Sequence, residues 1–147
     1  MRRNIRRLIG FAALAILPAC SDSSGPNQVQ AVAGSYALIS VNGILVPVVF
    51  SVDQFFILQI AAGTLTMNSN NTFSAAATFQ QTPAGGGTAT SETITCTGTY
   101  AMSGSTVTFT EASSSNDACG GVYTTTWDGT NSLAVNLDVG VQALFRK

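Results

Sequence analysis

The sequence predicts an all-β domain, in which an antiparallel up-and-down meander of about eight strands closes into a barrel. Apolar and polar residues alternate along most of the chain after residue 33, as they do in strands with one buried face. Turn-forming residues interrupt the alternation about every eight to twelve positions, the spacing of β-sandwiches and barrels. All eighteen threonines lie at or after Thr64, and β-branched residues favour strands. Closure is expected because it removes exposed sheet edges.

The elements follow from these signals in order. Asn42-Gly43 and Asn70-Asn71 are hairpin turn signals. Pro47 makes the segment around it an irregular or edge strand, and 55–61 fits a short helix or a buried strand equally well. The long strand that ends at Met102 is expected to bend near Gly98. We therefore expect strands at 35–41, 45–52, 64–68, 72–81, 88–102, 106–111, 122–127, 133–137 and 141–145.

The first twenty residues have the features of an export signal. Residues 1–7 contain four arginines, and residues 8–17 are uncharged and apolar, too short a run to span a bilayer but suited to a signal peptide. Leu17-Pro18-Ala19-Cys20, with the polar run after it, resembles the lipobox of bacterial lipoproteins. The resemblance implies a signal peptide over 1–19 and a lipidated Cys20. The residues after the cysteine are rich in Ser, Gly, Pro, Asn and Gln, which indicates a flexible tether. We therefore expect the lipidated cysteine and tether over 20–32 and the barrel domain over 33–147. An ordinary signal peptide or an uncleaved anchor is the alternative.

The lipobox resemblance also implies a location and a partner. A thioether-linked diacylglycerol and an N-terminal acyl chain such as palmitate anchor a protein stably, because they supply more than one chain. Ser21, rather than aspartate, follows the cysteine, which in lipoproteins of two-membrane bacteria favours the outer membrane. We therefore expect a cell-envelope protein whose partner is a membrane, held through the N-terminal lipid.

Charge and composition exclude several function classes. After removal of residues 1–19, two basic and seven acidic side chains remain, and no lysine or arginine lies between Arg7 and Arg146. Nucleic-acid binding needs a basic surface, so it is excluded. The absence of histidine excludes Ser-His-Asp hydrolysis, histidine-ligated zinc and haem with a proximal histidine. Glu92 and Glu111 are expected on the outer face, so no carboxylate pair for glycoside hydrolysis is expected. We predict no enzyme activity, cofactor or metal.

Two cysteines remain once Cys20 is assigned to lipid. Cys96 and Cys119 form an even pair in an exported chain and are predicted to make a disulfide. Two free thiols, or a metal pair that lacks its other ligands, are the alternatives.

The parity of the strand residues predicts a ligand site. Two small residues, Ala75 and Ala77, share a face with the large side chains on either side of them, which leaves a gap in the middle of a long strand. An apolar pocket there would favour a fatty or aromatic molecule over a sugar. Large side chains from the facing strands are the alternative filling of this gap. The candidate ligand-binding residues are Phe73, Ala75, Ala77, Phe79, Tyr100 and Phe109.

Several short motifs in 34–147 resemble small bacterial lipocalin-like domains. They are Gly34-Ser35-Tyr36-Ala37-Leu38, Gly63-Thr64-Leu65-Thr66-Met67, Gly98-Thr99-Tyr100 and Leu144-Phe145-Arg146-Lys147. The resemblance implies a barrel on a lipid tether, a non-enzymatic role and, in some members, a small apolar ligand. A structural or protein-interaction module with a filled barrel is the second hypothesis.

Overall fold

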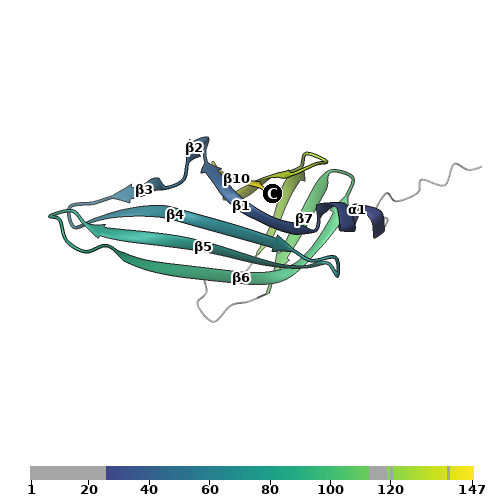
Figure 1. Ribbon diagram of the computed structural model, residues 1–147, viewed down its shortest axis with the longest axis horizontal. Helices are drawn as coiled ribbons and strands as arrows, with labels where there is room; N and C mark the ends of the chain where they lie inside the picture. Colours follow the sequence, from purple (N-terminus) through teal and green to yellow (C-terminus); the bar gives the residue numbers. More distant parts are fainter. Residues whose placement is uncertain (1–25, 113–118, 120, 139) are drawn as a thin grey trace, which may run out of the picture.

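The computed structural model of the chain describes residues 26–112, 119, 121–138 and 140–147. These residues form one short helix and a single antiparallel sheet of ten strands (Figure 1). The elements are α1 (Pro26–Val32), β1 (Gly34–Val41), β2 (Ile44–Leu45), β3 (Val48–Val52), β4 (Phe56–Met67), β5 (Thr72–Pro83), β6 (Thr90–Ser103), β7 (Thr106–Glu111), β8 (Val122–Trp127), β9 (Ser132–Asp138) and β10 (Val141–Arg146).

Eight of the strands close into a barrel, as predicted. Strands β4 to β10 pair in chain order, and β1 pairs with β10 on one side and with β4 on the other. The closing pair runs from Gly34 opposite Met67 to Ala37 opposite Thr64. The all-β fold and the closed antiparallel meander are therefore confirmed.

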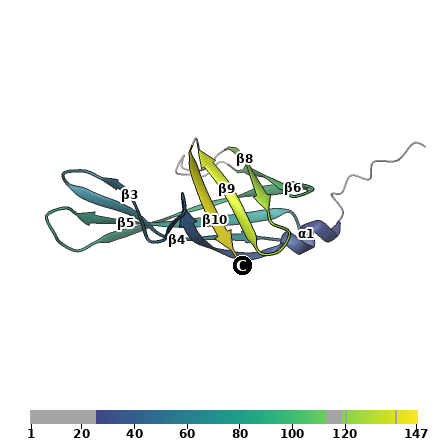
Figure 2. The same ribbon diagram turned by 90° about the horizontal axis from the view of Figure 1, so that it is seen from above.

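A sheet of four strands projects beyond the barrel. The first half of β4, before Thr64, does not pair with β1. It pairs instead with β3, from Val48 opposite Ile60 to Val52 opposite Ile57. The outer halves of β5 and β6 continue this sheet, which extends away from α1 (Figures 1 and 2). The ambiguous segment 55–61 is thus mostly strand, and Pro47 separates two short edge strands.

Helix α1 corrects the prediction of a flexible tether over 20–32, of which residues 20–25 lie outside the described part. The side chain of Val32 is completely buried, and its carbonyl accepts a hydrogen bond from the Tyr36 hydroxyl at 2.5 Å. Lys147 Nζ donates to the Ala31 carbonyl at 2.9 Å. Seven residues are too few for a stable isolated helix, so these contacts with the end of the barrel hold α1.

Most of the large buried side chains fill the half of the barrel next to α1. Phe73 and Phe109 pack edge to face, with ring centroids 4.9 Å apart, and Tyr100 donates its hydroxyl hydrogen to the Asn68 carbonyl at 2.6 Å. The other large buried side chains include Tyr36, Leu65, Met67, Met102, Val107, Trp127, Leu133 and Phe145. These contacts fill the end of the barrel next to α1 with side chains.

Candidate functional site: the open end of the barrel

A cavity of about 330 Å³ opens at the end of the barrel away from α1. Its walls come from the inner faces of the projecting strands and from the ends of the strands opposite them. The lining residues are Leu38, Val41, Ile60, Gly63, Thr64, Ala75, Ala76, Ala77, Phe79, Ile94, Cys96, Glu111, Tyr123, Leu137, Ala143 and Phe145.

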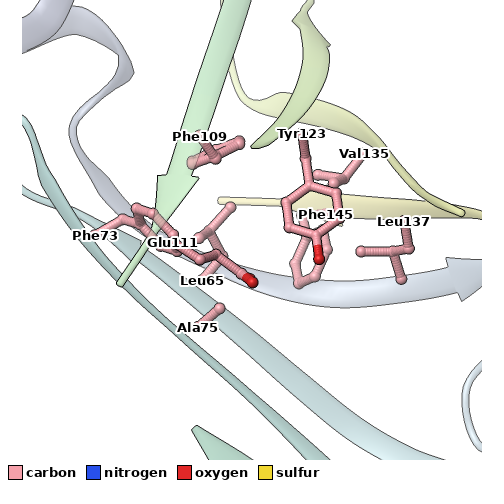
Figure 3. A pocket seen from close by; sticks show the side chains of 9 residues that line it. All are labelled: Leu65, Phe73, Ala75, Phe109, Glu111, Tyr123, Val135, Leu137 and Phe145. Atoms are coloured by element: carbon pink, nitrogen blue, oxygen red, sulfur yellow. The ribbon is translucent and has the colours of Figure 1, made fainter. Parts of the chain in front are cut away.

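A smaller cavity of about 60 Å³ continues the first toward the core. Figure 3 shows its nine lining side chains, which converge from both sides of the barrel: Leu65, Phe73, Ala75, Phe109, Glu111, Tyr123, Val135, Leu137 and Phe145. Five of them, Ala75, Glu111, Tyr123, Leu137 and Phe145, also line the larger cavity. The two spaces are therefore parts of one site.

Small residues on adjacent strands make this space. Gly63 pairs with Ala77, so neither strand sends a long side chain inward at that level. A Cβ atom on Gly63 would lie 3.0 Å from the side chain of Leu38, which shows how closely β1 crosses β4 there. The gap predicted from the two alanines of β5 is present in the structure.

The structure brings five of the six candidate ligand-binding residues to this site. Phe73 and Phe109 line the inner cavity, Ala77 and Phe79 line the outer one, and Ala75 lines both. The sixth, Tyr100, lines neither of the two and lies in the core. Its parity was interpreted correctly, but parity gives the face of a strand and not the height along the barrel axis.

The prediction that Glu92 and Glu111 face outward is wrong. Glu111 lines both cavities, and Glu92 pairs with Phe79, whose side chain faces the outer cavity. Directly opposed residues share a face, so Glu92 lies on the inner side of the projecting sheet. Both residues have the same parity as the apolar residues of their own strands, such as Ile94 and Phe109, and that signal could have placed them.

Cys96 and Cys119 lie at disulfide distance, with their Cα atoms 5.7 Å apart. Cys96 is on the inner face of β6 and lines the outer cavity. The pair therefore fastens the chain before β8 to the wall of the site.

The clearly perturbed ionisable groups lie at the other end of the barrel. Burial raises the pKa of Tyr36 to about 12, with a smaller contribution from the Asp128 charge, and burial also raises the pKa of Tyr100. Backbone N–H groups, first that of Ser132 and then that of Thr130, lower the pKa of Asp128. These groups hold the α1 end together and take no part in the cavity.

Other kinds of site were also sought in the described ranges. They contain no group of three histidine, cysteine, aspartate or glutamate side chains that could hold a metal ion. No helix among them has the length and apolar character needed to cross a membrane. Cys20 and the predicted signal peptide, residues 1–19, lie outside the described residues.

A second unusual surface is apolar and exposed. The edge strand β3 and the turn after it expose Val49, Phe50, Val52 and Phe55 by 53 to 67%. Neither parity nor turn signals distinguish such side chains from core residues in the sequence.

No family model, curated protein or solved structure matches this chain. The function is therefore inferred from the residues and the geometry alone.

Proposed function

We propose that this chain is a non-enzymatic lipoprotein of the bacterial cell envelope, anchored through Cys20, whose lipocalin-like barrel binds one small apolar molecule. The observation that carries the proposal is the cavity of about 330 Å³. Ligand sites are commonly concave, mostly apolar spaces of about 300–1,000 Å³. The cavity lies at the lower limit of that range, which favours a small or slender ligand.

The walls favour an apolar ligand. Aliphatic and aromatic side chains dominate both cavities, with few polar groups among them. Such walls exclude water from a ligand's apolar surface, and each buried square ångström of that surface contributes about 25 cal/mol. A sugar would leave many hydroxyl groups without partners there.

The proposed anchor and the cavity are compatible. The basic and apolar residues of 1–19 and the cysteine at position 20 support lipidation. Helix α1, which begins six residues after Cys20, packs against the end of the barrel away from the projecting sheet (Figure 2), whereas the cavity opens toward that sheet. An anchor at Cys20 would thus leave the mouth open.

Native mass spectrometry followed by solvent extraction tests the proposal. Protein purified from membranes should carry one small apolar molecule per chain, or take up one molecule of an added fluorescent apolar probe. Protein that carries nothing and takes up no probe would refute the proposed function.

The exposed edge strand favours a second candidate function, self-association. Strand β3 has a free edge and no charged side chain, so two copies can pair edge to edge without like-charge repulsion. Light scattering should then show a dimer that Phe50→Lys dissociates. A monomer at all concentrations would exclude this candidate.

A further inference from the structure

Glu111 places a carboxylate in the wall of a mostly apolar cavity. It is the only carboxylate among the lining residues of the two cavities, and no lysine or arginine lines either of them. The few polar groups in a mostly apolar ligand site fix the orientation of the ligand and supply specificity. The position of Glu111 therefore indicates that the polar end of a bound ligand would contact this carboxylate.

Strand pairing fixes where this carboxylate stands. Glu111 is the last residue of β7, its backbone N–H donates to the Gly121 carbonyl at 3.0 Å, and it pairs with Gly98 of β6. Gly98 has no side chain to crowd the inner face beside it. Figure 3 shows the Glu111 side chain extending past Phe73 and Leu65, with its carboxylate in the space between Ala75 and the aromatic rings opposite.

The charges around the site have one sign. In the described part of the chain the basic side chains are Arg146 and Lys147. Lys147 Nζ donates a hydrogen bond to the Ala31 carbonyl of α1, at the far end of the barrel. An anionic ligand headgroup would find repulsion here and no positive partner.

We propose that Glu111 makes this cavity a site for cationic amphiphiles, molecules with an apolar chain and a protonated amine, in preference to fatty acids. The inference rests on the proposed binding function and specifies its ligand class. A carboxylate oxygen accepts several hydrogen bonds, so the ammonium group binds Glu111 in addition to the partners that the side chain already has.

Cavity size sets the direction of the ligand. The inner cavity of about 60 Å³ is equivalent to only about two water molecules in the liquid, so the chain of the amphiphile cannot lie inward of Glu111. The chain runs outward along Ala75, Ala77 and Phe79 toward the mouth. The headgroup is thus inside and the tail faces the mouth.

Three probes of equal chain length test the proposal on the full protein: decylammonium, decanol and decanoate. Each is titrated against a neutral fluorescent apolar probe, with Glu111→Gln as the variant and Glu92→Gln as the matched control on the same face outside the cavity. The unaltered protein should bind decylammonium at least about tenfold more tightly than decanoate. Glu111→Gln should remove at least about tenfold of the decylammonium affinity and change that of decanol less than about threefold, and Glu92→Gln should keep most of the preference.

The outcomes separate this inference from the proposed function. Equal or tighter binding of decanoate by the unaltered protein overturns the ligand class and leaves the apolar cavity in place, and this comparison requires no variant to fold. An unchanged preference in a folded Glu111→Gln protein overturns the role of Glu111. Failure of all three probes and of the neutral probe to bind overturns the proposed function as well.

Discussion

A Cβ atom on Gly98 would lie 2.2 Å from the backbone carbonyl oxygen of Thr110. Strand β7 ends one residue later, at Glu111, and the part of β6 that precedes Gly98 leads into the projecting sheet. The barrel and the projecting sheet therefore separate at a glycine, at a point where no side chain would fit. This close approach also sets the position of Glu111 at the cavity.

Gly98→Ala should destabilise the protein, because the added methyl group meets backbone atoms that cannot rotate away. We expect a loss of about 1–3 kcal/mol in the free energy of unfolding, measured by urea denaturation. Gly85→Ala is the control, since a Cβ there meets no atom within 4 Å. Equal unfolding midpoints for the two variants would contradict the close approach.

Cys96 and Cys119 should react with thiol reagents only after reduction. Their 23-residue separation predicts that reduction lowers the free energy of unfolding by about 2–4 kcal/mol. Alkylation with mass detection, before and after reduction, gives the thiol count. Two reactive thiols in freshly purified, unreduced protein would refute the bridge.

Tyr36 should make the α1 end of the barrel sensitive to alkali. Burial raises its pKa from 10.0 to about 12, so the folded state favours the protonated hydroxyl. The contribution of this pKa shift to the free energy of unfolding is fully present below pH 10 and is lost as the pH rises from 10 toward 12.

Tyr36→Phe should cost about 0.5–1.5 kcal/mol at pH 7, because the hydrogen bond to the Val32 carbonyl is lost. It should also flatten the fall of stability above pH 10. Urea denaturation at several pH values measures both effects. A variant with the same alkaline slope as the unaltered protein would show that Tyr36 is not the group responsible.

Cys20→Ser should prevent lipidation, since the thioether needs the cysteine thiol. The variant should accumulate as an unprocessed or soluble form in cell fractionation. If it is cleaved normally and stays with membranes through an alkaline wash, the lipoprotein assignment is wrong.

Most of the fold could be predicted because one physical rule, burial of one face per strand, governs it. The two phenylalanines and two alanines of β5 show this directly, since their alternation located both the strand and the gap. Helix α1 escaped prediction because only contacts made by distant residues, such as Tyr36 and Lys147, stabilise it. The projecting sheet escaped it because 55–61 has no clear period.

The candidate site was predicted only in part. Parity placed Phe73 and Phe109 correctly but could not show that Tyr100 lies too deep in the barrel to reach the cavity. Glu111 was misplaced, although Val107 and Phe109 share its parity and are both buried.

Probe titration of Ala77→Phe tests the cavity most directly. Ala77 lines the outer cavity, so a phenylalanine ring there occupies the space proposed for the ligand chain. Ala101→Phe is the matched control, since Ala101 is an exposed residue of β6. The account predicts that Ala77→Phe abolishes binding of a neutral fluorescent apolar probe with little loss of stability, and that Ala101→Phe binds the probe normally. Unchanged probe binding by Ala77→Phe, with unfolding destabilised by about 1–3 kcal/mol as in a packed core, would contradict it.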